Sequence, residues 1–254
     1  MRLRLIACEV LAREVYLCAA FSPHTVDVEL IEKGLHNTPD LLRAQLQDRI
    51  DALCNGPYDA LILGYGLCGN ALLGLTARDV RLVMPRAHDC ITLYLGSRES
   101  YNTQFSDNPG TYYYTSDYIE RVCFDPKTAA ISLGAVTQQD LQSVYEDYVV
   151  KYGKDNADYL MEVMGEWGKH YERAAFIDMG TGDGQEFEQR ARDEAQRRGW
   201  IFERKEGSKR LLKMLADGTW NEDEFLIVPP GHVIQQTGLD GLITAAKANG
   251  TGND

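Results

Sequence analysis

The chain has 254 residues, with 26 Lys and Arg against 38 Asp and Glu, and a formal net charge of -12. This acidic excess argues against binding to nucleic-acid phosphates, and no apolar run approaches the ~20 residues needed to cross a bilayer. The N-terminus, MRLRLIACEV, has too short an apolar stretch for a secretory signal, so we expect a cytoplasmic protein. In that reducing compartment the six cysteines should pack, bind metal or react rather than form disulfides.

The first half of the chain alternates short apolar runs with a helical pattern, which is typical of βαβ units around a parallel sheet. Thr38 and Pro39 begin a predicted helix, with Thr38 as its N-cap and the proline in the first turn. Helical spacing of apolar residues continues to about residue 53. Strands are predicted at residues 3–7, 26–31, 58–63 and 80–84.

The pattern changes between residues 97 and 172, where a tyrosine cluster in NPGTYYYTSDYIE precedes a long polar helix predicted from about 138 to 171. The second half then resumes the alternation. Gly199 is expected to end a helix as its C-cap, and Ser208 is expected to begin another as its N-cap. The predicted elements are strands at 174–179, 200–204 and 225–228 and helices at 185–198 and 208–216.

We therefore predict an α/β protein with two Rossmann-like or flavodoxin-like lobes, each with a parallel sheet. The expected parts are an N-terminal lobe (1–97), a tyrosine-rich segment with a helical insertion (98–172), and a C-terminal lobe with a short flexible tail (173–254). ALILGYGLCGN and AFIDMGTGDGQ both have the pattern of a strand, a glycine turn and a helix. Internal duplication is a hypothesis that follows from this likeness.

Three cysteines follow predicted strands directly, namely Cys8, Cys68 and Cys90. In open α/β sheets, ligands bind outside the carboxyl ends of the strands. Three thiolates with an open fourth position can hold a [4Fe-4S] cluster or Zn²⁺. The chain has no compact CxxC pair, so the alternative is that each cysteine packs as a small hydrophobic residue. Packing is the interpretation for the other three, Cys18, Cys54 and Cys123.

Polar residues beside the three thiols are candidates for catalysis. Arg86 could bind a carboxylate or phosphate and His88 could relay protons, with Glu9 as a further helper next to Cys8. The alternative interpretation of the PRAHDC turn is that Asp89 caps a helix beginning at Cys90, with Arg86 on the surface.

Two glycine-rich turns are candidates for cofactor binding, because such turns allow the backbone to approach an anion or a cluster sulfide. Nucleotide binding is the lesser interpretation, since the first turn lacks the lysine of a P-loop and no acidic residue ends the next strand. In the second turn, Asp183 could instead cap the following helix. The candidates are Gly64, Gly66, Gly69 and Asn70 in the first turn and Gly180, Gly182 and Asp183 in the second.

Several motifs together resemble one family, catalogued as domain of unknown function 1638. They are ACEVLARE, LGYGLCGNAL, MPRAHDCITLYLGS, NPGTYYYT and GTWNEDEFLIVPPG. The resemblance brings no established activity. It implies a cytoplasmic protein often encoded beside corrinoid-dependent methyltransferases, and hence a link to methyl-group or corrinoid metabolism by association.

The leading hypothesis is thus a metal- or iron-sulfur-dependent enzyme or accessory protein with Cys8, Cys68 and Cys90 as ligands. One alternative is a protein that binds a corrinoid or a methyltransferase without catalysis. Another is a metal-free enzyme with Cys68 as nucleophile and His88 as base. The expected partners are a small molecule in a cleft between the lobes and a corrinoid protein or methyltransferase, with neither nucleic acid nor membrane.

Overall fold

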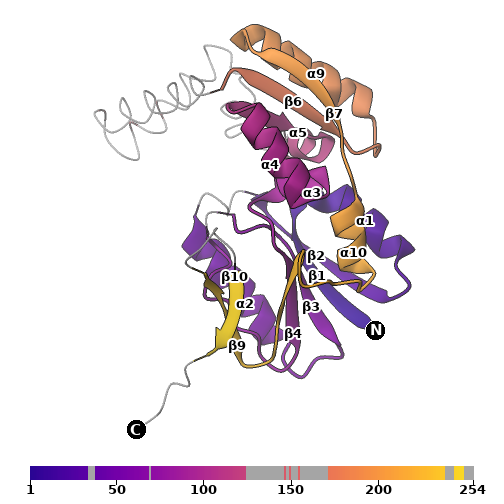
Figure 1. Cartoon of the computed structure of the whole chain (residues 1–254), viewed down its shortest axis with the longest axis vertical. Helices are drawn as coiled ribbons and strands as arrows, with labels where there is room; N and C mark the ends of the chain where they lie inside the picture. The colour runs from indigo at the N-terminus through magenta and orange to yellow at the C-terminus, as the bar shows by residue number, and fades with distance from the viewer. Residues whose placement is uncertain are drawn as a thin grey trace. The chain divides into compact units, whose positions relative to one another are not determined.

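A computed structural model of the chain describes residues 1–33, 38–68, 70–123, 171–237 and 243–248, and the single positions 146, 149 and 154 (Figure 1). The chain forms two compact units. Unit 1 consists of Met1–Asn102 and Ser208–Asp254, and unit 2 of Thr103–Gly207. The long helix predicted from about 138 to 171 falls almost wholly outside the described residues. In the part that is described, no helix is both long and apolar enough to cross a membrane.

Unit 1 is built on a five-stranded sheet with the order β2-β1-β3-β4-β8. The first four strands are parallel, and β8 pairs antiparallel with β4 at the edge. The predicted α/β class with a parallel sheet is therefore confirmed. The strands are β1 (Arg2–Cys8), β2 (Thr25–Ile31), β3 (Ala60–Gly64), β4 (Arg81–Pro85) and β8 (Phe225–Val228).

The strand order creates a switch point between β1 and β3. From β1 the chain moves to β2 on one side and then crosses to β3 on the other. Ala7 pairs with Gly64 at the carboxyl ends of these two strands. In doubly wound sheets the loops diverge at such a point and leave a crevice where ligands bind.

Helices cover both faces of this sheet (Figure 1). On one face, α2 (Pro39–Ala52) buries Leu42, Leu46 and Ile50, which are four residues apart and so lie on one side of the helix. The hairpin of β9 (His232–Gln236) and β10 (Ile243–Lys247) adds Ile234 and Ile243 to that core. The other face is covered by α1 (Ala12–Phe21) and α10 (Arg210–Ala216), which contact each other.

Short helices follow two of the strand ends. A 3-10 helix, η1 (Glu9–Leu11), continues directly from β1, and α3 (Cys90–Leu95) follows β4. The next helix, α4 (Arg98–Asp107), begins in unit 1 and ends in unit 2.

Unit 2 has a three-stranded parallel sheet of order β5-β6-β7. Its core joins Tyr114 and Phe176 to Ala191 and Ala195, which lie four residues apart on α9. Tyr112 and Tyr114 lie two residues apart on β5 and so share a face of the sheet, with ring centroids 4.9 Å apart. The elements are β5 (Thr111–Tyr114), α5 (Ser116–Cys123), β6 (Arg173–Asp178), α9 (Gly184–Arg198) and β7 (Ile201–Glu206).

The C-terminal lobe and the first glycine turn differ from the sequence analysis. The segment expected to form one C-terminal lobe is divided, because α10, β8 and the hairpin belong to unit 1. After the first glycine turn, residues 70–74 form turns and no helix, so the strand–turn–helix likeness holds only for the second turn, where α9 follows β6. A local pattern identifies a strand or a turn, but the sheet that a strand joins depends on distant partners.

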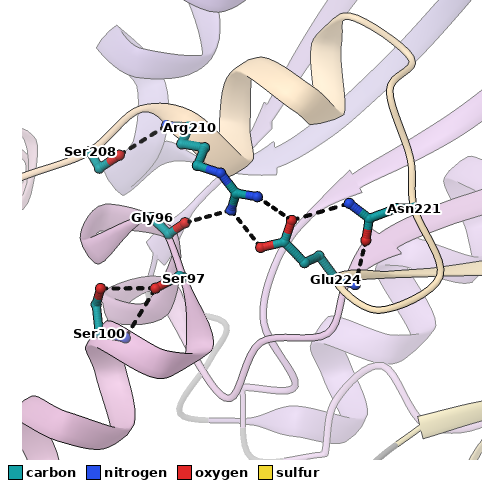
Figure 2. Close-up of polar contacts among 7 residues, drawn as sticks. All are labelled: Gly96, Ser97, Ser100, Ser208, Arg210, Asn221 and Glu224. Carbon is teal, nitrogen blue, oxygen red and sulfur yellow. Dashed lines mark hydrogen bonds and ion pairs between the residues drawn. The ribbon is translucent and has the colours of Figure 1, made fainter.

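The chain re-enters unit 1 at Ser208, beside the end of α3 at Gly96 (Figure 2). Gly96 ends α3 with a φ of 78°, and a Cβ placed there would lie 2.5 Å from the Ser208 side chain. Arg210 donates to the Gly96 carbonyl at 3.3 Å and forms a two-pronged ion pair with Glu224. Ser208 accepts a hydrogen bond from the Arg210 amide, but α10 begins two residues after it, so the predicted N-cap is displaced by one residue.

Candidate functional site

The four parallel strands of unit 1 end at one edge of the sheet, and each end contributes a polar or thiol side chain. Cys8 is the last residue of β1, and Cys68 lies four residues beyond β3. Cys90 follows β4 as the first residue of α3. Because β1 and β3 flank the switch point, the sequence-predicted thiols of Cys8 and Cys68 come from the two strands that border the expected crevice.

The loops after β3 and β4 are joined by backbone hydrogen bonds. Leu67 donates its amide to the Ala87 carbonyl at 2.9 Å, and Cys68 donates to the His88 carbonyl at 3.1 Å. Gly66 makes this contact possible, since a Cβ at that position would lie 2.5 Å from the Asp89 amide nitrogen and Cα. The sequence predicts that this glycine lets the backbone approach a ligand closely. In the structure it lets the backbone approach the neighbouring loop at Asp89.

Cys68 has an unusual backbone conformation. Its φ is 45°, in the left-handed region that residues with a Cβ adopt at a cost of roughly 1–2 kcal/mol. Asn70 follows with a φ of 69°, which is less costly because asparagine tolerates this region. Strained residues gather at functional sites, where the surrounding structure holds them in place. The conformation of Cys68 therefore supports a functional role for this loop.

Asp89 fixes the start of the helix that carries Cys90. Its Oδ1 accepts hydrogen bonds from the amides of Ile91 and Thr92 at 3.0 and 3.3 Å. The hydroxyl of Tyr101 donates to Oδ2 at 3.3 Å. The predicted N-cap is confirmed. Burial nevertheless raises the pKa of Asp89, because desolvation of the carboxylate outweighs these hydrogen bonds.

Burial holds all three thiols in their neutral form. It raises the pKa of Cys8 to about 11 and that of Cys68 to about 12, and the pKa of Cys90 lies well above its usual value. After burial, the charges of neighbouring groups contribute. Cys8 and Asp89 act on Cys68, and Asp89, Cys68 and Cys8 act on Cys90. The three thiols thus lie within electrostatic reach of one another, and a metal cation bound to them would favour their thiolate forms.

Lys33 is a member of this cluster that the sequence analysis did not identify. It lies two residues beyond β2, and its amide donates to the Glu9 Oε1 at 2.9 Å. Burial lowers the pKa of its ammonium to about 8, although Cys8, Cys90 and Glu9 favour the charged form. The signal that could have revealed it is its place after a strand of the same parallel set.

Tyr65 is the second residue that sequence reasoning left without a role. It comes directly after β3 and is only 3% exposed. Its hydroxyl oxygen is buried and has no hydrogen-bond partner among the described residues. Burial raises the pKa of Tyr65, and the charges of Cys8 and Cys68 raise it further, so the ring lies near both thiols.

The predicted catalytic helpers lie in different settings. Arg86 donates to the carbonyl oxygens of Glu222, at 2.9 Å, and Ile243, so its guanidinium holds backbone segments of unit 1 together. His88 is exposed and stacks on Tyr101 with ring centroids 5.8 Å apart. It is the carbonyl of His88 that meets Cys68. Glu9 accepts from Lys33 beside the thiols, so of the three it is the one within the cluster.

The glycine turns belong to separate units. Gly64 ends β3, where a Cβ would lie 2.7 Å from that of Ala7, and Gly69 lies outside the described residues. In unit 2, Gly180 and Gly182 have φ values of 64° and 70°. The amide of Gly180 donates to Asp178 at 2.8 Å, and Asp183 precedes α9 without a side-chain cap. Gly180, Gly182 and Asp183 therefore belong to unit 2, whereas the three candidate cysteines belong to unit 1.

The remaining cysteines include one clear packing residue. Cys18 is buried in α1, as predicted. Cys54 is half-buried just after α2, and the side chain of Cys123 lies outside the described residues.

Within the described part of the chain, no three His, Cys, Asp or Glu side chains are gathered closely enough to hold a single metal ion.

Comparison with known proteins identifies one family. Neither the curated proteins nor the solved structures include a match to this chain. A family model described as protein of unknown function (DUF1638) matches residues 30–216. That span contains Lys33, Tyr65, Cys68 and Cys90, while Cys8 precedes it. Because the match covers most of the sequence, the chain belongs to the DUF1638 family.

Proposed function

We propose that unit 1 binds a [4Fe-4S] cluster through Cys8, Cys68 and Cys90, with one iron left open to a small ligand. The observation that carries this proposal is the arrival of three thiols at the carboxyl edge of one parallel sheet, two of them at its switch point. Iron–sulfur clusters are held by cysteine thiolates, and a cluster with three protein ligands has a coordination position to offer.

The raised pKa values favour a metal centre over a metal-free nucleophile. A thiol whose pKa is about 11 or 12 is almost entirely protonated at pH 7 and reacts poorly. His88 does not supply a base to Cys68 through any contact described here, since its carbonyl makes the hydrogen bond. A metal cation would remove this difficulty, because it is itself the charge that favours the thiolate.

A cluster makes a less strict demand on the spacing of three thiols than one zinc ion does. Three sulfurs bound to zinc lie within roughly 4 Å of one another, because each bond is only about 2.3 Å long. The described residues provide no group that compact. A four-iron cluster is larger and holds its thiolates further apart, so it does not require so compact a group.

The iron without a protein ligand would be the reactive part of the proposed site. It would act as a Lewis acid toward a bound ligand, in the way that metal sites polarise oxygen or sulfur donors. By association, the sequence resemblance supports a link between that chemistry and methyl-group or corrinoid metabolism, and the proposed site does not itself require a corrinoid. The proposed role is therefore a cluster-dependent enzyme or accessory factor.

Anaerobic purification of the full chain tests the proposal. We expect about four irons and four sulfides per chain, as the composition of the cluster requires, with broad sulfur-to-iron charge-transfer absorption. Cys8→Ser, Cys68→Ser and Cys90→Ser should each lose most of the iron. Cys54→Ser and Cys18→Ser are matched controls in the same unit and should retain it.

Other results would contradict the proposal in distinct ways. If the protein contains zinc in place of iron and the same three variants lose it, the three cysteines are the ligands but the metal is zinc. If the wild-type protein takes up no metal on reconstitution, both the proposed ligands and the proposed metal are wrong. Binding of cobalamin by such metal-free protein would favour the alternative of a non-catalytic corrinoid-binding protein.

A further inference from the structure

Tyr65 has a buried polar group, its hydroxyl, in the unit that carries the thiols. Tyr65 is only 3% exposed to solvent, and it belongs to the apolar core of unit 1. Its hydroxyl has no hydrogen-bond partner among the described residues. Buried hydroxyls are normally hydrogen-bonded, and an unpaired one in a native structure calls for a specific explanation.

The surroundings of the hydroxyl point to the thiol site. Tyr65 directly follows β3, three residues before Cys68, and is influenced by the charges of Cys8 and Cys68. Cys8 and Cys68 both pack against the core cluster that contains Tyr65. Lys33 adds a cationic group within electrostatic reach of Cys8 and Cys90. The carboxyl groups of Glu9 and Asp89 act on the same three thiols, so Lys33 alone does not set the charge of the site. A ligand held at these thiols would meet the Tyr65 hydroxyl as a hydrogen-bond donor.

We infer that Tyr65 donates its hydroxyl hydrogen to the ligand on the open iron, and that the site takes a small ligand with a hydrogen-bond acceptor. The inference rests on the proposed cluster. It names the class of ligand from the chemistry of the phenol, which donates a hydrogen bond to an acceptor. Tyr65 is thus a positioning residue for the ligand and has no role in holding the iron.

Cyanide is a suitable probe, because it binds iron through carbon and leaves its nitrogen as an acceptor. We expect reconstituted Tyr65→Phe to keep its iron and sulfide content and to bind cyanide about tenfold to a hundredfold more weakly. That factor is the one expected when a hydrogen bond to a charged group is lost. The affinity is measured by titration of the electron paramagnetic resonance signal of the reduced cluster.

Tyr94→Phe is the matched control. Tyr94 is equally buried in unit 1, but its hydroxyl already donates to the Val10 carbonyl. Its removal should leave cyanide affinity unchanged. Equal affinity in wild type and Tyr65→Phe, with both clusters intact, would overturn the inference and leave the cluster in place. A wild-type chain that forms no cluster would instead overturn the proposed function, and this inference with it.

A second measurement covers the case in which Tyr65→Phe does not retain its cluster. Electron-nuclear double resonance on the wild-type protein with bound ¹⁵N-cyanide should detect an exchangeable hydrogen at hydrogen-bond distance from the nitrogen. Its absence would overturn the inference without use of any variant.

Discussion

The amide of Cys68 donates a hydrogen bond to the carbonyl of His88 at 3.1 Å, and this contact joins the loops that carry two of the three thiols. Cys68 is held by the loop after β4 as well as by its own, so its left-handed φ of 45° is imposed by a neighbour. The same contact fixes the distance between the backbone of Cys68 and the start of α3, where Cys90 lies. The geometry of the site therefore depends on how closely two backbones approach.

Gly66→Ala should separate these loops. The new Cβ would lie 2.5 Å from the amide nitrogen and Cα of Asp89, and backbone atoms cannot rotate away as a side chain can. We expect a loss of about 3 kcal/mol in the free energy of unfolding, as for overpacked positions, together with loss of bound iron. Chemical denaturation and iron analysis measure the two effects.

Gly180→Ala is the control for this substitution. Gly180 has a φ of 64° but nothing within 4 Å of a Cβ, so its change should cost only the strain of the left-handed backbone, roughly 1–2 kcal/mol. A Gly66→Ala protein that is no less stable than Gly180→Ala, and that binds iron normally, would show that the two loops are free to move apart.

The strain at Cys68 can be separated from the loss of its sulfur. Cys68→Ala and Cys68→Gly both remove the thiol, but only glycine adopts a positive φ without a steric penalty. We expect the glycine variant to be more stable than the alanine variant by about 1 kcal/mol, and both to lack iron. The order would be reversed if the loop adopts an ordinary conformation, because glycine then only adds freedom to the unfolded chain.

The sequence is sufficient to predict that the three thiols lie at one edge of the sheet, because this placement depends only on the direction of the strands. Parallel strands end at the same edge, so residues that follow them converge even without knowledge of the strand order. The pattern could not assign Phe225–Val228 to the sheet of unit 1, since its partner β4 is distant in the sequence. Nor could it identify the partners of Arg86, which are carbonyls of residues 222 and 243. The burial of the Tyr65 hydroxyl without a partner among the described residues is likewise a property of packing.

Tyr65→Phe should not destabilise the cluster-free protein. Removing a buried hydroxyl that has no partner in the described structure eliminates a desolvation cost and leaves the ring in the core. Tyr94→Phe removes a hydroxyl that does have a partner and should cost about 1 kcal/mol. Thermal unfolding of both variants without metal provides the comparison. A clear loss of stability in Tyr65→Phe would mean that its hydroxyl already has a partner within the protein.

The Arg210–Glu224 ion pair should make unit 1 sensitive to acid at the point where the chain re-enters it. Arg210 holds the pKa of Glu224 below its usual value, mainly through the hydrogen bonds of its guanidinium, and Asn221 adds another at 3.2 Å (Figure 2). A carboxyl group with a depressed folded-state pKa stabilises the fold above its unfolded pKa of about 4.3. That contribution to stability disappears as the pH falls through the lower pKa that Glu224 has in the folded protein.

Glu224→Gln isolates this contribution. The Arg210 side chain is 50% exposed, so solvent screening limits the expected cost at pH 7 to about 1 kcal/mol. The difference between variant and wild type should shrink toward zero below the folded pKa, because the wild-type carboxyl is then neutral as well. Urea denaturation at pH 7 and at successively lower pH measures this convergence. A difference that persists unchanged in acid would assign the effect to packing around Gly96, to whose carbonyl Arg210 also donates, and not to the charge of Glu224.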